Sequence, residues 1–538
     1  MRRYLLPAFA LLLALLVGFG IGFHSGFKKD ILFEGIVKAV RLMQPMKEVT
    51  ADAEIQLDMS DQTLLDSTLL PTHKREVLVT DPGGKPLPLL ASAVDTGDES
   101  IVIAAQGSLF RLKTGACPGE DCVKQVGRLV RPDGTLLEDI YDLLSIEVDG
   151  KREWYVSYGQ KDRTRYHKWI AVSRFELPEG QGAIQRIEPP LFEGRPFSLR
   201  KGHSALSGGG AMVYDPKSDD IILTIGDFSL NGVSNDFPGD IPPPQTLDSD
   251  LGKIFRINRK TGERHVVSIG HRNPQGLALS DSGELISTEH GPKGGDEINL
   301  IEEGHNYGWP YTSFGAVYTT YTFPEKPPTH EGRFGEFTLP ILSFLPSPGI
   351  SALTFIKDFD PAWDGDLMVT TLKARTLFRV RRWETGKSTG SYVEQIYIGD
   401  RMRDIDIVEG VMVITTDSGK IIMLTPVENV QMARTETGLV TNLNVLATCG
   451  SCHNMNYPVS TQDAPHLRNI MGRNIGSAPD FGRYSDALKA MSDKTWDAES
   501  LEKFIRSPQD FAPGTAMPPV DLDDDQIKEL MKDLALLR

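Results

Sequence analysis

Short apolar segments of strand type alternate with turn residues from about residue 50 to 425. Examples are "DIILTIGDF", "GKIFRIN" and "VMVITTDSGKIIML", which are bounded by Gly, Pro, Asp and Asn. Such segments, repeated at short intervals with few long amphipathic helices, are typical of a β-sandwich, a β-barrel or a β-propeller. The length of the region fits six four-stranded blades, although no clean blade repeat is visible. The sequence therefore predicts an all-β six-bladed propeller.

The pattern changes near Thr437, where helical periodicity replaces the strand pattern. In "DLDDDQIKELMKDLALL" the apolar residues Ile527, Leu530, Met531 and Leu534 fall on one helical face. A second helical segment is "WDAESLEKFIRSP". We therefore expect the propeller over residues 31–430 and a small all-α domain over residues 437–538.

The N-terminus is the most apolar part of the chain. After Arg2 and Arg3, the nineteen residues Leu5–Phe23 carry no charge, and as a helix they would span about 28 Å, enough to cross a bilayer. A cleaved signal peptide is the alternative, but only a weak small-x-small cleavage site is present. Residues 1–30 are therefore predicted to be an N-terminal transmembrane or signal helix. The protein is expected in the periplasm, anchored to the inner membrane, or released there after cleavage.

The charge and the cysteines limit the partners and the compartment. The formal net charge of -16 argues against a nucleic-acid partner, which would require clustered Lys and Arg. Of the four cysteines, Cys117 and Cys122 stand close together in "ACPGEDC". In an oxidising compartment they are predicted to form a disulfide. The alternative is two surface thiols in a turn.

The segment "ATCGSCHNM" carries a C-x-x-C-H motif, formed by Cys449, Cys452 and His453. Two such thiols attach a haem covalently and the imidazole binds its iron. A second axial ligand is expected from Met517 in the Pro-rich loop "FAPGTAMPP". His/Met ligation raises the reduction potential and gives a one-electron acceptor.

The segments "APHLRNIMGRNIGSAPDFGRYSDALK" and "TWDAESLEKFIRSPQDFAPGTAMP" resemble the mitochondrial-type class I cytochromes c. The resemblance covers most of the C-terminal hundred residues. It implies one covalently bound haem c, with Pro465 supporting His453. It also implies that Arg473, Tyr484 and Trp496 meet the haem propionates. The expected downstream partner is another cytochrome, an oxidase or a quinone-linked electron acceptor.

The long segment from Gly270 to Pro310, "GHRNPQGLALSDSGELISTEHGPKGGDEINLIEEGHNYGWP", combines apolar strands, a Gly-Pro turn and an Asp-Glu pair. By itself it suggests a loop that offers carbonyls and carboxylates to a hard cation such as Ca²⁺. It resembles the signature of the soluble quinoprotein glucose and aldose sugar dehydrogenases. These are six-bladed propellers that carry pyrroloquinoline quinone (PQQ), a two-electron cofactor.

The resemblance assigns cofactor-binding residues by position. Arg272 and Asn273 fall on the family's PQQ-binding pair, and the carbonyls of Gly291 and Pro292 fall on the ligands of its cofactor-site Ca²⁺. Glu297 and the backbone of Tyr307 fall on the ligands of a second, structural Ca²⁺.

Further cations follow in "TLKARTLFRVR" and "GDRMRDIDI", which place Lys373, Arg401 and Arg403 on the family's PQQ-binding lysine and arginine pair. PQQ has three carboxylates, which need charge-assisted partners. A solvated strand face is the alternative for the two arginines.

A general base is needed to remove the hydroxyl proton of the sugar, and His suits this role near neutral pH. In "GHSALSGGGAMVYDPKSDDIILTIGD" the resemblance assigns it to His203. The match is looser here because extra residues, Ser204 to Gly209, intervene. A second departure is His290, where the glucose enzymes have Gln.

These expectations combine into one function. His203 and Arg272 serve the PQQ- and Ca²⁺-dependent oxidation of an aldose or related sugar aldehyde, and the electrons pass to the haem and on to a respiratory acceptor. A sorbosone-type dehydrogenase would share the chemistry but differ in substrate. A non-catalytic ligand-binding propeller that carries an electron-transfer cytochrome is the other alternative. The joint presence of Lys373, Arg401 and Arg403 favours the enzyme.

Overall fold

The computed structural model describes two parts of the chain. They comprise residues 56–427 and 449–537, apart from 61, 66, 68–69, 118, 120–121, 163–166, 181, 199–206, 235–236, 238, 317–332, 386–387, 450–452, 455–459, 461–463, 521 and 523. The chain divides into two compact units: the first comprises the chain up to Thr63 and Lys74–Thr425, and the second comprises Leu64–His73 and the chain from Pro426. The N-terminal segment Leu5–Phe23 and the predicted domain boundary at 430–437 lie outside the described residues. Among the residues that the structure does describe, no helix is long and apolar enough to cross a bilayer.

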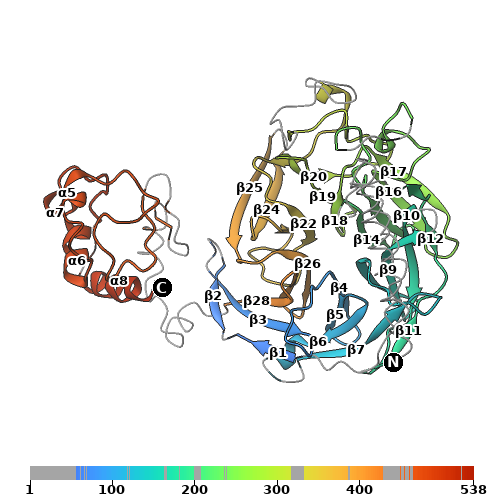
Figure 1. Ribbon diagram of the computed structural model, residues 1–538, viewed down its shortest axis with the longest axis horizontal. Helices are drawn as coiled ribbons and strands as arrows, with labels where there is room; N and C mark the ends of the chain where they lie inside the picture. Colours follow the sequence, from blue (N-terminus) through green and yellow to red (C-terminus); the bar gives the residue numbers. More distant parts are fainter. Residues whose placement is uncertain are drawn as a thin grey trace, which may run out of the picture. The chain divides into compact units, whose positions relative to one another are not determined.

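The first unit contains six β-sheets in the described part of the chain, which confirms the predicted propeller (Figure 1). We number the sheets as blades 1 to 6. Blade 1 joins both ends of the unit, in the order β1-β3-β28-β27-β26 with β2 paired to β3. Its strands are β1 Gln56–Met59, β2 Thr63–Leu65, β3 Thr72–Thr80, β26 Met402–Val408, β27 Val411–Thr416 and β28 Lys420–Pro426.

The other blades follow in chain order. Blade 2 is β4 Ala91–Asp95, β5 Ser100–Ala105, β6 Ser108–Leu112, β7 Val123–Val130 and β11 Ile184–Arg186, and blade 3 is β8 Ile140–Val148, β9 Lys151–Asp162, β10 His167–Phe175, β12 Phe192–Glu193 and β13 Phe197–Ser198. Blade 4 is β14 Gly209–Asp215, β15 Asp220–Ile225, β16 Lys253–Asn258 and β17 Arg264–Ile269, and blade 5 is β18 Pro274–Leu279, β19 Leu285–Glu289, β20 Asp296–Leu300 and β21 Leu342–Phe344. Blade 6 is β22 Ile350–Phe355, β23 Leu367–Thr371, β24 Thr376–Thr385 and β25 Ser388–Tyr397. Short 3₁₀ helices η1 Thr114–Ala116, η2 Pro243–Gln245 and η3 Arg333–Glu336 lie in the connections.

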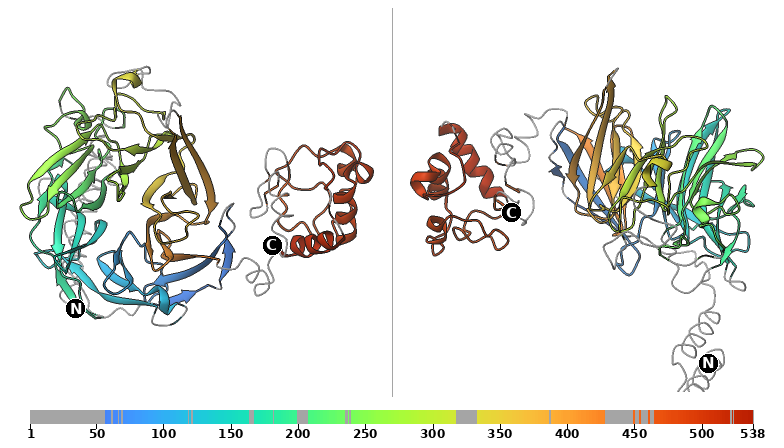
Figure 2. Two further views of the ribbon diagram at one scale, coloured as in Figure 1. Left: turned by 180° about the vertical axis from the view of Figure 1, so that it is seen from behind. Right: turned by 90° about the horizontal axis from the view of Figure 1, so that it is seen from above.

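The innermost strands β4, β8, β14, β18, β22 and β26 contact one another in this order, and β26 returns to β4, so the ring is closed (Figures 1 and 2). Because the strands within a blade are antiparallel, each second strand ends at the face where its innermost strand begins. We call this face the top face. Apolar side chains between neighbouring sheets form the core, as in the cluster that packs Tyr155, Phe192 and Phe255 between blades 3 and 4.

Buried hydroxyl groups join one blade to the next near the top face. Ser157 Oγ donates to the Gly210 carbonyl at 2.6 Å, and Thr224 Oγ1 donates to the Pro274 carbonyl at 2.9 Å. Thr288 Oγ1 donates in the same way to the Ser351 carbonyl. Each bond runs from a blade's second strand to the start of the next blade's innermost strand, so it fixes the relative height of the two blades.

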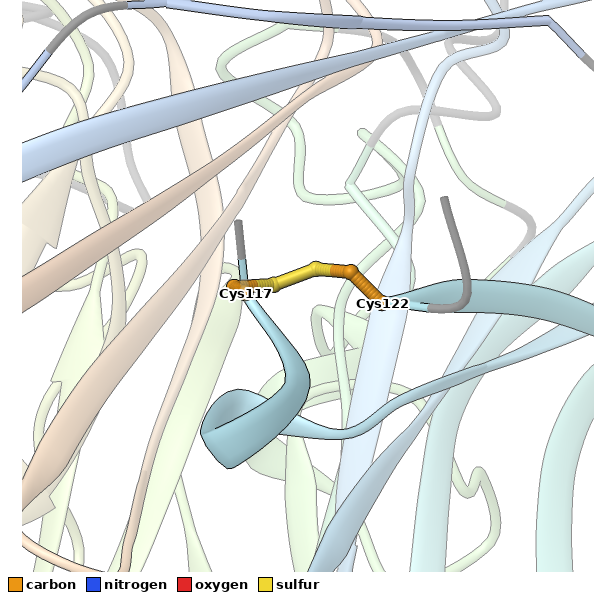
Figure 3. Close-up of a disulfide and its surroundings, with 2 residues drawn as sticks. All are labelled: Cys117 and Cys122. Carbon is orange, nitrogen blue, oxygen red and sulfur yellow. A yellow bond between two sulfur atoms is a disulfide. The ribbon is translucent and has the colours of Figure 1, made fainter. Parts of the chain in front are cut away.

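The disulfide between Cys117 and Cys122 is confirmed (Figure 3). It joins the end of η1 to the start of β7, with the two Cα atoms 5.0 Å apart. Cys122 is buried in the cluster between blades 1 and 2.

The second unit is helical, with a buried core (red in Figure 2). Its helices are α5 Asp486–Lys489, α6 Ala498–Arg506, α7 Pro508–Phe511 and α8 Asp524–Leu536. The Asp497 side chain caps α6 and exchanges hydrogen bonds with Ser500. Ile527, Leu530 and Leu534 are buried, as the periodicity predicts.

The innermost strands supply three of the carboxylates that line a central cavity of about 850 Å³: Asp142 of β8, and Asp404 and Asp406 of β26. Burial, together with repulsion from Asp404, raises the pKa of Asp142 well above its ordinary value. The same two causes raise the pKa of Asp406 to about 7. Asp406 Oδ2 is buried, and no described residue forms a hydrogen bond with it. The uncharged form of Asp406 is therefore the one that the fold favours.

This cavity predicts a pH-dependent stability. A carboxyl group whose pKa is raised by folding stabilises the fold below its unfolded pKa near 4, and that contribution is lost as the pH rises through about 7. Asp406→Asn should therefore raise the free energy of unfolding of the propeller by roughly 1–2 kcal/mol at pH 8, with little change at pH 5. Urea unfolding at both pH values measures this, and an equal effect at both would contradict it.

Candidate active site

Several residues singled out by the sequence come together at the top face. Arg272 and Asn273 directly precede β18, and His290, Gly291 and Pro292 follow β19. Lys373 follows β23, while Arg401 and Arg403 lie at the start of β26. These positions are the beginnings of innermost strands and the ends of second strands, so blades 1, 5 and 6 present them on one face.

Arg272 is held at several points. Its Nη1 donates to the carbonyls of His290 at 3.0 Å and Gly291 at 2.8 Å. Its guanidinium lies 5.5 Å from the centre of the Trp309 ring, and its carbonyl accepts from the backbone N–H of Asp227 at 2.7 Å. Arg272 Nε is buried and has no hydrogen-bond partner among the residues that the structure describes. A donor is therefore left over for a group that is not part of the protein.

A buried polar chain behind Arg272 was not predicted from the sequence. The Arg272 backbone N–H donates to Glu289 Oε1, and Glu289 Oε2 lies 2.9 Å from His271 Nδ1. His271 Nε2 lies 2.8 Å from Ser268 Oγ, and the His271 ring stacks on Tyr307. Because a carboxylate only accepts, Nδ1 carries the ring proton and Nε2 accepts from the serine. This chain fixes the backbone that carries Arg272.

Asn273 connects two blades. Its Oδ1 accepts from the backbone N–H of Gly209 at 3.2 Å, at the start of β14, and from Gln275 Nε2 at 3.1 Å. Its carbonyl accepts from the backbone N–H of His290. Asn273 therefore holds the start of blade 4 against blade 5.

Asp296 organises the Gly-Pro loop. Its Oδ1 accepts from the Gly291 N–H at 3.0 Å and from Ser347 Oγ at 2.7 Å, and its Oδ2 accepts from the N–H groups of Gly349 at 2.7 Å and Ile350 at 2.9 Å. A Cβ at position 291 would lie 2.1 Å from the Gly295 carbonyl oxygen, so only glycine fits there. One fully buried carboxylate thus joins the loop after β19 to the start of blade 6.

Arg401 and Arg403 share one carboxylate, that of Asp417 after β27. Arg401 Nε donates to Asp417 Oδ2 at 2.8 Å, and Arg403 pairs with both oxygens. Burial alone would raise the pKa of Asp417, but the two guanidinium groups hold it below its ordinary value. Arg401 Nη1 also donates to the Leu372 carbonyl at 3.4 Å, beside the exposed Lys373. Two guanidinium groups on one carboxylate, with Lys373 next to Leu372, leave a positive charge that suits an anionic ligand.

His290 lies close to both groups of cations. The pKa of His290 is lowered to about 4, and burial is the main cause. The charges of Arg272 and Arg403 lower it further, while the charge of Asp296 raises it. The imidazole is therefore neutral at working pH.

A small cavity of about 10 Å³ lies below Arg272, with room for about one small ion or water. It is lined by Glu289, Glu297, Gly291, Tyr307 and Trp309, among others. Burial and the nearby Glu289 raise the pKa of Glu297 well above its ordinary value. A cation would relieve this repulsion. In the part of the chain that the structure describes, no three His, Cys, Asp or Glu side chains cluster as metal ligands, so backbone carbonyls would have to complete a Ca²⁺ site.

The sequence also singled out residues that the structure does not describe. His203 and Cys452 lie outside the described residues. The nearest described positions to His203 are Ser198 in β13 and Ser207, whose carbonyl accepts from the Phe228 N–H.

In the helical unit, His453 Nδ1 donates to the Pro465 carbonyl at 2.6 Å, the contact that the sequence predicts. Burial lowers the pKa of His453, and its Nε2 takes no part in the bond to Pro465. Cys449 and Met517 both pack against the core of this unit.

The three residues expected at the propionates lie in the same unit. Trp496 is buried and stacks on Phe511, and the Tyr484 hydroxyl accepts from the Ala478 N–H at 3.1 Å. Arg473 Nη2 donates to the His466 carbonyl, while its Nε is buried without a hydrogen-bond partner. A cluster with a spare buried guanidinium donor fits a group with carboxylates, such as haem.

Comparison with known proteins identifies relatives of the propeller. The family model of Glucose / Sorbosone dehydrogenase matches residues 94–423. The aldose sugar dehydrogenase YliI of Escherichia coli (strain K12) is 30% identical over 237 residues, which are 40% of this chain and 60% of that protein. Quinoprotein glucose dehydrogenase B of Acinetobacter calcoaceticus is 36% identical over 146 residues, 23% of this chain and 29% of that protein. The chain therefore spans less than two thirds of the length of these relatives.

A solved structure supports the fold. The soluble aldose sugar dehydrogenase from Escherichia coli in its apo-form superimposes with a TM-score of 0.50 at 21% identity, covering 70% of this chain and all of that one.

The C-terminal part has separate relatives. Cytochrome c2 of Afifella marina is 33% identical over 75 residues, which are 14% of this chain and 60% of that protein.

The contacts of Asp296 generate a stability prediction. Asp296→Ala leaves three buried backbone N–H groups without an acceptor, so it should lower the free energy of unfolding of the propeller by about 3 kcal/mol or more. The control Ser347→Ala removes only one of the four bonds and should cost about 1 kcal/mol. Urea unfolding measures both, and equal losses would show that the backbone bonds to Asp296 do not carry the stability.

Proposed function

Because this chain belongs to the glucose/sorbosone dehydrogenase family, we propose that it is a PQQ- and Ca²⁺-dependent sugar dehydrogenase that passes electrons to its own haem c. The substrate is an aldose or related sugar aldehyde. The observation that carries the proposal is the convergence of Arg272, Lys373, Arg401 and Arg403 at the top face.

The residues at the top face fit PQQ. Its carboxylates would be held by Arg401, Arg403 and Lys373, where the two arginines share Asp417. Arg272, with its spare buried Nε, and Asn273 would hold the quinone end. PQQ supplies the two-electron redox chemistry when bound. A binding scaffold without the cofactor would not need this concentration of cations.

The protein groups then have separate roles. His203 accepts the proton of the sugar hydroxyl, since an imidazole titrates near working pH. Arg272 directs its guanidinium donors toward the place where negative charge develops, and its position is fixed by Glu289 and His271. His290 stays neutral, because its pKa is low, and keeps the site free of another positive charge.

Two Ca²⁺ sites are part of the proposal. The carbonyls of Gly291 and Pro292 would hold the ion at the cofactor. Glu297 and the backbone of Tyr307 would hold the structural ion. This assignment is supported by the small cavity that Glu297 and Glu289 line together.

The C-terminal unit would carry one covalent haem c through Cys449 and Cys452, with His453 and Met517 as axial ligands. Such a haem accepts electrons singly at a high potential. Its relatives among the cytochromes c and the spare donor of Arg473 support this. The disulfide fits an oxidising compartment, so we place the protein in the periplasm, with the N-terminal segment as its membrane anchor or signal. A downstream cytochrome, oxidase or quinone-linked acceptor would take the electrons.

Reconstitution tests the function. Protein made without PQQ should reduce no dye with aldoses, and PQQ with Ca²⁺ should restore the activity. Arg403→Met should weaken PQQ binding by about 10- to 100-fold, since it removes a charge-assisted partner. Arg382→Met is the matched control, because Arg382 pairs with Glu284 instead. His203→Ala should keep PQQ binding and lower turnover by about 10²- to 10⁴-fold.

Three results would count against the proposal. These are sugar oxidation by quinone-free protein, equal PQQ affinity of the two arginine variants, and unchanged turnover of His203→Ala. The last would move the base elsewhere, and His290 would be the next candidate.

Electron flow to the haem can be tested through its axial ligand. Met517→Ala should leave the haem attached but lower its reduction potential, because the thioether favours ferrous iron. A dye that accepts electrons directly from the propeller should still report sugar oxidation, while reduction of an external cytochrome should fall. Met491→Ala, a methionine of the same core, should leave the potential unchanged. If Met517→Ala abolished both activities in folded protein, the propeller would not be an independent catalytic unit.

A further inference from the structure

Lys168 is a buried cation in blade 3. It is the second residue of β10 and only 2% exposed. Its ammonium lies 5.0 Å from the centre of the Phe228 ring and 5.5 Å from that of Tyr141. Its stem passes Gly159, where a Cβ would come within 3.2 Å of Lys168 Cε. The aliphatic part is thus packed, and the charge faces two aromatic rings.

This ammonium has contacts with ring faces but no hydrogen bond or ion pair with any described residue. The nearest acid is Asp139, and that carboxylate pairs with Lys161 of β9. Lys253 shows the usual alternative, since it is as deeply buried but donates to the carbonyls of Pro243 and Leu251, each at 2.7 Å. An ammonium that is buried with unused donors is costly unless a ligand supplies the acceptors.

The surroundings of Lys168 are positive. Lys161 lies opposite Lys168 in the β9–β10 ladder. Arg131 reaches the same end of β9, where it donates to the Gln160 side chain and the Gly159 carbonyl rather than to a carboxylate. In the part of the chain that the structure describes, Asp139 pairs with Lys161 and is the acid whose charge acts on Lys168, while Arg131 interacts with Asp133. Lys168 therefore has no counter-charge of its own among these residues. An anion would complete this charge balance.

Lys168 is also placed beside the proposed cofactor residues. Phe228 follows Asp227, whose backbone N–H donates to the Arg272 carbonyl. Tyr141 lies at the start of β8 and lines the central cavity together with Arg403. Lys168 itself pairs with Phe197 of β13, near the top face. Lys168 and its two aromatic neighbours therefore lie next to chain segments that carry Arg272 and Arg403.

We propose that Lys168 is a specificity-determining residue that binds an anionic group of the substrate, and that the substrate is a sugar acid with a free reducing end, such as a uronic acid. This inference rests on the proposed function. A single ammonium between two aromatic faces suits a carboxylate, because a phosphate dianion is usually held by several donors.

The test compares matched substrates with the PQQ- and Ca²⁺-loaded enzyme. D-glucuronate and glucose differ only at C6, and glucose 6-phosphate tests the phosphate alternative. The expected kcat/KM for glucuronate exceeds that for glucose by about 10- to 100-fold. Lys168→Met should remove this preference mainly through KM for glucuronate and leave glucose nearly unchanged. Lys168→Arg, which keeps the charge, should retain most of it.

Lys253→Met is the control for the loss of a buried ammonium, and it should not change the ratio of the two substrates. A purely structural role of Lys168 would alter the kcat/KM of both substrates equally.

The titratable groups around Lys168 are Asp139 and Tyr141 at the start of blade 3, Lys161 of β9, and Asp227 beside Phe228. Burial lowers the pKa of Lys168 to about 8; the charge of Asp139 opposes this shift, and the charge of Lys161 adds to it. Because Lys168 loses its charge above this pH, the preference for glucuronate should decline as the pH rises through about 8.

Calorimetric titration of the quinone-free protein with D-glucuronate separates this inference from the proposed function. Binding by the wild type and its loss in Lys168→Met would support the inference even if no sugar were oxidised, an outcome that would refute only the proposed function. Equal kcat/KM for glucose and glucuronate, or a ratio unaffected by Lys168→Met, would overturn the inference. A preference for glucose 6-phosphate would overturn the assignment to a sugar acid.

Discussion

The hydroxyl-to-carbonyl hydrogen bonds between neighbouring blades are the contacts on which the top face depends. The hydroxyl groups of Ser157, Thr224 and Thr288 each donate to a backbone carbonyl in the next blade. Each of these carbonyls lies at the beginning of an innermost strand, where the chain has just left a top-face loop. Because these bonds are buried, shifting one blade along the axis would leave both a donor and an acceptor unsatisfied. Ser351 Oγ continues the series into blade 1, where it donates to the Arg403 carbonyl at 3.0 Å. The loops that carry Arg272 and Arg403 are therefore held at one level although they belong to different blades.

Buried carboxylates perform the finer positioning. Asp296 joins the Gly-Pro loop to the start of blade 6, and Glu289 fixes the backbone of Arg272. Neither is an exposed ligand-binding group in this arrangement. Their contribution is to remove conformational freedom from neighbouring loops, which lowers the cost of binding an ordered cofactor.

The strand pattern was sufficient to predict the blades, because turn residues recur between apolar segments of strand length. The resemblance of local motifs singled out Arg272, Lys373 and Arg403, which the structure brings to one face, while their roles at a cofactor stay predictions. The roles of His271 and Asp296 could not be predicted, since their partners are defined by packing between blades and not by spacing along the chain. Lys168 was missed for the same reason: in "HKWIAVSRF" it reads as one polar residue of an ordinary strand. The roles of His203 and of the N-terminal segment stay predictions.

The closure of blade 1 has a consequence for how the protein is made. β3, from the start of the propeller, pairs with β28, its last strand, so this contact is of very high sequence separation. Contacts of this kind form late, because the intervening chain must be ordered first. Until residue 426 has been synthesised and the last strand is free to pair, the ring stays open and β3 presents an unpaired edge. Unpaired edges are prone to aggregation during folding. An early strand of the propeller is therefore exposed to aggregation until the last strand pairs with it.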